Sequence, residues 1–71
     1  MVWMNIDIPE RKCTIHTNSC RYVQDKKETK YKGIMELKEH GGWLEFETTS
    51  KAENYQKSRF PEYRLIICKC N

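Results

Sequence analysis

Two stretches decide how this chain folds: CTIHTNSCRYV at residues 13–23 and ICKCN at residues 67–71. Together they contain all four cysteines and one of the two histidines of the 71-residue chain. A domain of this size buries only about 60% of the surface that its unfolded chain exposes, so its core is marginal. Such domains commonly need disulfides, a metal ion or a partner chain. We therefore expect the two stretches to meet and close the fold around a metal ion.

The choice between a metal ion and disulfides depends on the cellular compartment. The chain begins with MVWMNID, which lacks both a basic segment and a long apolar run, so the sequence predicts no secretion signal. No stretch is apolar for long enough to cross a membrane. We therefore expect a cytoplasmic protein, in which thiols stay reduced and Cys/His clusters more often bind metal. Two disulfides are the alternative, for a processed secreted chain or a hyperthermophile protein.

The spacing of the cysteines and histidine fits a zinc site. Zinc prefers four tetrahedral ligands drawn from Cys thiolates and His nitrogens. His16 and Cys20 have three residues between them. Cys68 and Cys70 are separated by one residue, so their sulfurs face the same way if this segment is extended. This C-x-C gap is shorter than the usual two to four residues. The predicted zinc ligands are His16, Cys20, Cys68 and Cys70.

Cys13 is a fifth candidate ligand near the same site. In a strand it would lie beside Ile15 and face away from His16, so we interpret it as a small buried hydrophobic residue. If Cys68 is the buried thiol instead, the alternative ligands are Cys13, His16, Cys20 and Cys70. A third interpretation has no metal and places the thiols in the core.

Alternating apolar and polar residues predict short strands in both halves of the chain. The first covers Val2–Ile8 and ends at Pro9, because proline cannot donate a hydrogen bond to a neighbouring strand. Trp3 falls on its otherwise polar face, where another element should cover it. The other predicted strands are Lys12–His16, Trp43–Glu47 and Tyr63–Cys68.

Helical signals are found in the second half of the chain. Ser50 and Glu53 have the spacing of a capping box, which predicts a helix over Ser50–Arg59. Ile34–Glu39 contains good helix formers, so we expect a short helix there that ends near an exposed His40. A hairpin turned at residues 41–42 is the alternative. The sequence thus predicts one zinc-stabilised α+β domain over residues 1–71, with three to four short strands and one or two short helices.

The positive charge of the chain is local. The net charge is +3, but seven bases and only two acids lie between residues 11 and 32. The run Gln24–Lys32 lacks aliphatic residues and should be an exposed basic loop. Such bases can neutralise phosphates, and Tyr22 and Tyr31 can stack on bases of DNA or RNA. The predicted nucleic-acid-binding residues are Arg11, Lys12, Arg21, Tyr22, Lys26, Lys27, Lys30 and Lys32.

A resemblance rests on His16-x-x-x-Cys20-Arg21-Tyr22, Phe46-x-x-Thr49-x-x-Ala52 before a helix, Tyr63 and the terminal cysteine pair. This pattern resembles small Ada-like zinc-binding modules, some of them appended to bacterial nucleases and DNA-uptake proteins. Those modules end in Cys-x2-Cys, whereas this chain has Cys68-Lys69-Cys70. The resemblance implies a structural zinc bound by His16, Cys20 and Cys70, and an association with DNA.

Two further function classes compete with nucleic-acid binding. A protein–protein adaptor or inhibitor of a larger complex would use Trp3, Trp43 and tyrosines as exposed interface anchors. An enzyme is not expected, because four Cys/His ligands leave zinc no open position and the chain has no credible nucleophile–base pair. Thiol exchange at Cys68-x-Cys70 is the remaining catalytic alternative. We see no small-molecule substrate and no membrane partner.

Overall fold

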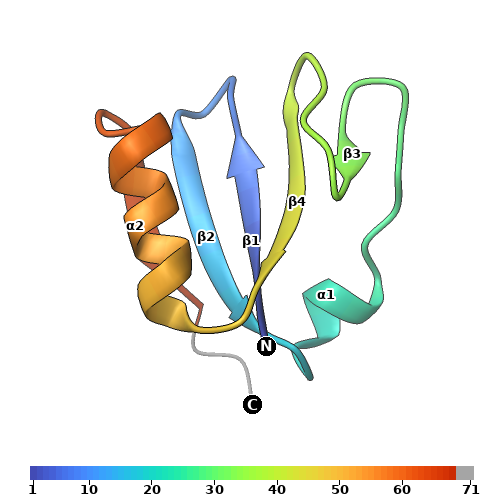
Figure 1. Ribbon diagram of the computed structural model, residues 1–71. Coiled ribbons are helices and arrows are strands. Elements are labelled where there is room, and N and C mark those ends of the chain that lie inside the picture. Colours follow the sequence, from blue (N-terminus) through green and yellow to red (C-terminus); the bar gives the residue numbers. More distant parts are fainter. Residues whose placement is uncertain (69–71) are drawn as a thin grey trace.

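The computed structural model describes residues 1–68, in which five strands form one mixed sheet and two helices pack against it (Figure 1). The predicted α+β class is therefore confirmed. The elements in chain order are β1 (Val2–Asp7), β2 (Lys12–Thr17), α1 (Arg21–Gln24), β3 (Gly33–Ile34), β4 (Gly41–Phe46), α2 (Thr49–Arg59) and β5 (Arg64–Ile67). Within this range no helix is long and apolar enough to span a bilayer.

The sheet has the strand order β3-β4-β1-β2-β5, with β1 at its centre. β1 pairs antiparallel with both β2 and β4. The outer pairs are parallel, β5 with β2 and β3 with β4. Four of these strands coincide closely with the predicted ones, because their alternating pattern matches strands that bury one face in the main core. The two-residue β3 was not predicted.

One face of the sheet packs against α2 and forms the main core. Met4 and Ile6 of β1 meet Cys13 and Ile15 of β2, and Ala52 of α2 completes this buried cluster. Phe46 and Tyr55 add a ring contact between β4 and α2, with centroids 5.3 Å apart. The even-numbered side chains of β1 thus face α2, as the alternation predicted.

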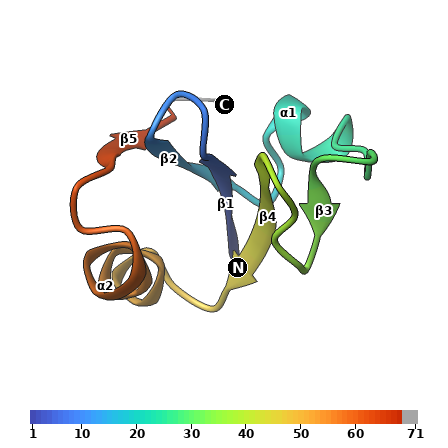
Figure 2. The same cartoon turned by 90° about the horizontal axis from the view of Figure 1, so that it is seen from above.

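The opposite face carries α1, as the view from above shows (Figure 2). Here Trp3, Cys20, Val23 and Trp43 form a second buried cluster. Trp3 Nε1 donates to Asn18 Oδ1 at 3.1 Å, and Lys26 Nζ lies 4.2 Å from the centre of the indole ring. The expectation that another element covers Trp3 is confirmed. The exposed tryptophan anchors that the adaptor hypothesis required are absent, because Trp3 and Trp43 are only 8% and 7% exposed.

The segment predicted as a helix over residues 34–39 is irregular. Ile34 pairs with Trp43 in β3, and the next amide, of Met35, donates to the Trp43 carbonyl at 2.7 Å. Met35 has a φ of 60°, which an α-helix excludes. Six good helix formers contribute little alone, because a short helix gains too few hydrogen bonds to offset nucleation. The alternative, a hairpin turned at residues 41–42, also differs from the structure, because the tight turn spans Lys38–Gly41.

The predicted helix before Pro61 is confirmed, but its first turn differs. α2 begins at Thr49, and Thr48 is the N-cap, whose hydroxyl oxygen accepts from the Lys51 backbone N–H at 3.2 Å. The expected capping box at Ser50 is therefore wrong, because the hydroxyl of Thr48, two residues earlier, caps the helix instead. At the other end of α2, Gln56 Nε2 donates to the backbone carbonyls of Phe60 and Tyr63, both at 2.9 Å.

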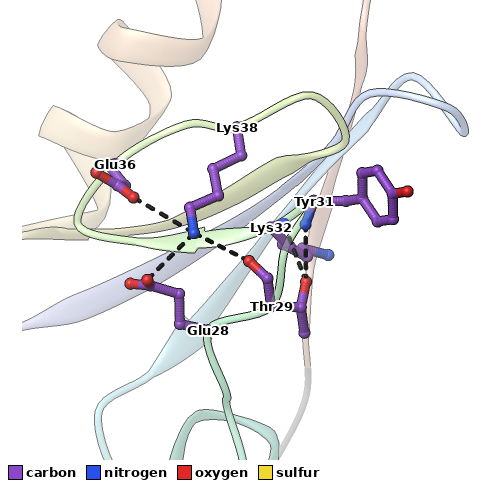
Figure 3. A network of polar contacts seen from close by, with 6 residues as sticks. All are labelled: Glu28, Thr29, Tyr31, Lys32, Glu36 and Lys38. Carbon is purple, nitrogen blue, oxygen red and sulfur yellow. Dashed lines mark hydrogen bonds and ion pairs between the residues drawn. The ribbon is translucent and has the colours of Figure 1, made fainter.

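The long loop after α1 is held by a polar network (Figure 3). Lys38 Nζ lies 3.1 Å from Glu28 Oε2 and 3.7 Å from Glu36 Oε1, and it donates to the Thr29 carbonyl at 3.0 Å. Thr29 Oγ1 accepts from the backbone N–H groups of Tyr31 and Lys32. The predicted loop is confirmed, and these contacts fix the part of it that carries Tyr31.

Candidate metal centre

The parallel pairing of β2 with β5 brings the two cysteine-containing stretches together. Ile15 pairs with Ile67, so His16 and Cys68 are the next residues along two adjacent strands that run in the same direction. The Cys68 backbone N–H donates to the Ile15 carbonyl at 2.8 Å and extends this pairing. The end of the sheet therefore places one histidine and one cysteine side by side.

A tight turn returns Cys20 to the same place. The Cys20 N–H donates to the Thr17 carbonyl at 3.0 Å, as expected for the turn-forming residues between His16 and Cys20. Cys20 then starts α1 as its N-cap residue, with its carbonyl accepting from the Val23 N–H at 3.0 Å. Its side chain is fully buried. Cys20 Sγ consequently lies 3.5 Å from His16 Nδ1.

The potential ligand atoms of His16, Cys20 and Cys68 all lie within 4.8 Å of one another. Zinc bonds of about 2.3 Å to sulfur and about 2.0–2.1 Å to nitrogen, at a tetrahedral angle, put the two ligand atoms about 3.6 Å apart. The observed separation of 3.5 Å between His16 Nδ1 and Cys20 Sγ is close to this distance between two zinc ligands. These three residues can therefore hold a metal ion.

The surroundings of His16 favour the form that binds metal. The side chain is buried, and this burial lowers its pKa below the ordinary value, which keeps the imidazole neutral near pH 7. Metal ligation requires a neutral imidazole. The ring also packs against Trp43, with centroids 5.3 Å apart, and against Tyr22 at 5.8 Å. These contacts orient the imidazole before any ion binds.

Cys13 does not belong to this group of residues. It pairs with Ile6 and lies in the core beneath α2, fully buried, on the face of the sheet opposite to Trp43 and His16. Burial raises the pKa of its thiol from 9.0 to about 11, which disfavours the thiolate. The alternative ligand set containing Cys13 is therefore wrong, and the interpretation of Cys13 as a small core residue agrees with its position.

The three cysteines of the described residues differ in their chemical state. Cys13 and Cys68 carry free thiols, whereas Cys20 is disulfide-bonded in this structure. Since a metal binds the thiolate, the metal-binding form of this site requires Cys20 in its reduced state. The fourth predicted ligand, Cys70, lies outside the described residues. His40 is exposed and stacks on Tyr31, with ring centroids 4.8 Å apart, and takes no part in the group.

The structure brings together four of the eight residues predicted to bind nucleic acid. Lys12, Tyr22, Lys26 and Lys27 line one pocket of about 430 Å³ beside His16, on the face of the sheet that carries α1. Arg21 is exposed on α1 and Arg11 lies in the turn between β1 and β2. Lys30 Nζ lies 5.6 Å from the Tyr31 ring centre, and Lys32 lines a separate pocket with Tyr31 and His40.

Sequence reasoning missed the other residues of the first pocket, which are Asn5, Asp7, Thr14, Asp25 and Trp43. Asn5, Asp7 and Thr14 are the polar members of alternating strands, a position usually exposed to solvent. The signal that could have revealed them is that Trp3 and His16 share their face. Two large buried rings on a polar face indicate that another element covers part of it.

Comparison with known proteins finds no matching family model, no matching curated protein and no matching solved structure. The conclusions about function therefore depend on the geometry of the described residues.

Proposed function

We propose that this chain is a module with a structural zinc site and that it binds nucleic acid. The observation that carries the zinc proposal is the approach of His16 Nδ1 to within 3.5 Å of Cys20 Sγ, with a ligand atom of Cys68 within 4.8 Å. Two sulfurs and one imidazole nitrogen form a donor set that suits zinc. The sequence supplies Cys70 as the fourth ligand, which would leave no open position for catalysis.

The role of the ion in this proposal is to cross-link distant parts of the chain. His16 is the penultimate residue of β2, Cys20 is the N-cap of α1 and Cys68 follows β5, so one ion would tie three elements together. A bound zinc ion contributes its binding free energy directly to folding, because the unfolded chain has no preformed site. In a domain with a marginal core this contribution is large compared with the total stability.

Zinc binding is tested by native mass spectrometry of the chain in the presence of a thiol reductant. We expect a mass gain of one zinc ion, and we expect a chelator to remove both the ion and the cooperative unfolding transition. The reductant is essential because Cys20 is disulfide-bonded in this structure. A reduced chain that stays folded and binds no zinc would contradict the proposal.

The nucleic-acid part of the proposal is supported by the position of the basic residues. Lys12, Lys26 and Lys27 gather around one pocket, next to the Tyr22 ring, which is 60% exposed. Lysines can neutralise phosphates and an exposed aromatic ring can stack on a base. The resemblance to Ada-like zinc-binding modules implies the same association with DNA.

Salt-dependent binding of oligonucleotides tests this part. We expect Lys12→Ala and Lys27→Ala to weaken binding and to lower the slope of log affinity against log salt. The matched control is Lys57→Ala, because Lys57 is exposed on α2, on the opposite face of the sheet. Undetectable association with DNA and RNA at low salt would contradict nucleic-acid binding without affecting the zinc proposal.

A further inference from the structure

The pocket beside His16 has the size and position of a ligand site. Its volume is about 430 Å³, which lies within the range of roughly 300–1,000 Å³ typical of small-molecule sites. Its floor is the sheet, with Asn5 of β1 and Thr14 of β2 on neighbouring strands in direct register. The segment 22–27 forms the facing wall. The pocket thus adjoins the metal centre through His16, which lines it.

The amide of Asn5 is the feature of this floor that lacks a partner. Its Oδ1 is buried and makes no hydrogen bond within the described part of the chain. A buried acceptor without a partner costs about 1–3 kcal/mol. Asn5 lines the pocket, so a bound ligand whose N–H group pairs with this oxygen removes that cost. The floor of the pocket therefore favours a ligand that carries hydrogen-bond donors.

The charged residues of the pocket point to the same kind of ligand. Asp7 and Asp25 add carboxylate acceptors to the lining, while Lys12 and Lys27 add positive charge. Lys26 is already engaged, because its Nζ donates to the Val23 carbonyl at 3.1 Å and lies over Trp3. A ligand that suits both sets of charges has N–H donors at one end and a phosphate at the other.

Aromatic rings complete the pocket. Trp43 and Tyr22 both line it, and both contact the imidazole of His16. The Tyr22 ring is 60% exposed and gives a nucleobase a surface on which to stack, whereas Trp43 is only 7% exposed. Such stacking contributes about 1–3 kcal/mol per base. A base can reach such a pocket only when it is unpaired and unstacked from its neighbours.

We propose that this pocket binds one unpaired nucleobase of a single-stranded nucleic acid, and that it prefers a base with an exocyclic amino group, such as cytosine, over thymine. This inference rests on the proposed nucleic-acid binding and deepens it. Carboxylate and amide oxygens accept hydrogen bonds from the amino group of cytosine, whereas thymine presents a carbonyl oxygen at that position. Lys12 and Lys27 contact the adjoining phosphates.

The test compares labelled oligo(dC) and oligo(dT) of equal length, by fluorescence anisotropy with the reduced, zinc-supplemented chain at low salt. We expect oligo(dC) to bind about tenfold more tightly, as one or two additional hydrogen bonds imply. Asn5→Leu should abolish this preference and leave the weaker, salt-dependent affinity. The matched control is Asn54→Leu, because Asn54 is exposed on α2 on the other side of the sheet.

A stability measurement separates a binding role of Asn5 from a structural one. Because Asn5 Oδ1 has no protein partner, Asn5→Leu should unfold at the same or a higher denaturant concentration than the unmodified chain. Equal affinity for oligo(dC) and oligo(dT), or an unchanged preference in Asn5→Leu, would overturn the pocket proposal while nucleic-acid binding stands. Absence of binding to both oligonucleotides would reject nucleic-acid binding and the pocket proposal together.

Discussion

Cys13 and His16 lie three positions apart on one strand, yet their side chains lie on opposite faces of the sheet. Cys13 packs in the core beneath α2, whereas His16 packs against Trp43 on the face that carries α1. This separation follows from the alternation of side chains along a strand. It divides the cysteines into one structural thiol and a group that can hold a metal ion.

Alanine substitution of the two free cysteines should therefore have contrasting effects. Cys68→Ala should weaken zinc binding more than about a hundredfold, since even the removal of an outer-shell partner of a metal ligand costs 10–100-fold. Cys13→Ala should leave zinc affinity unchanged and reduce stability by about 1 kcal/mol through the small cavity that it creates. Competition with a chromophoric chelator measures the affinity, and denaturant unfolding of the zinc-loaded form measures the stability. Equal zinc affinities of the two variants would contradict the assignment.

The N-cap of α2 provides a second test, because two candidate residues, Thr48 and Ser50, differ in role. Thr48→Ala should destabilise the protein by about 1 kcal/mol, since it removes the oxygen that accepts from the Lys51 N–H. Ser50→Ala should be nearly neutral, because Ser50 is exposed in the first turn of the helix. Urea unfolding of both variants gives the comparison. A larger loss in Ser50→Ala would restore the capping box predicted from the sequence.

Gly41 should be intolerant of any side chain. It has a φ of 109°, and a Cβ atom there would collide with the carbonyl oxygen of Ile6 on the central strand. Gly41→Ala should reduce stability by at least about 1–3 kcal/mol, the usual cost of a strained backbone conformation. Glu39→Ala in the same turn is the control, since Glu39 is exposed and should change stability little. Thermal unfolding followed by circular dichroism measures both, and a stable Gly41→Ala variant would contradict the described turn.

The parts of the fold that the sequence predicts well are those with a local pattern. The alternation from Val2 to Ile8 determines which side chains of β1 face the core, and the same alternation separates Cys13 from His16. The parallel pairing of β2 with β5 has no local signal, because it joins residues about fifty positions apart in the chain. Only the chemistry of the cysteines indicated that these stretches meet.

The wrong predictions have physical causes that can be located. Ile34–Glu39 has helix-forming residues, but pairing with β4 satisfies the Met35 amide and a positive φ bends the chain. The adaptor hypothesis required Trp3 and Trp43 to be exposed anchors, but a single helical turn after Cys20 packs against them. Asn5 and Thr14 were missed because polar residues at alternate strand positions are normally exposed to water.

The buried thiol of Cys13 should make stability depend on pH in the alkaline range. Its pKa is raised from 9.0 to about 11 by burial, so the folded state binds the thiol proton more tightly than the unfolded state. The resulting stability is fully present below pH 9 and is lost as the pH rises toward 11. A shift of this size corresponds to roughly 2–3 kcal/mol. Denaturant unfolding at pH 8 and at pH 10.5 measures the loss.

Tyrosines and lysines also titrate in this range, so the comparison must be made against Cys13→Ala, which keeps all other groups. The unmodified chain should lose more stability between the two pH values than Cys13→Ala, because only its unfolded state is favoured by ionisation of a Cys13 thiol that stays protonated in the folded state. In the native state at pH 8, iodoacetamide should modify Cys68 before Cys13, since Cys68 is partly exposed and Cys13 fully buried. Identical pH dependence in the two proteins, or faster modification of Cys13, would place Cys13 outside the core and reopen its role as a metal ligand.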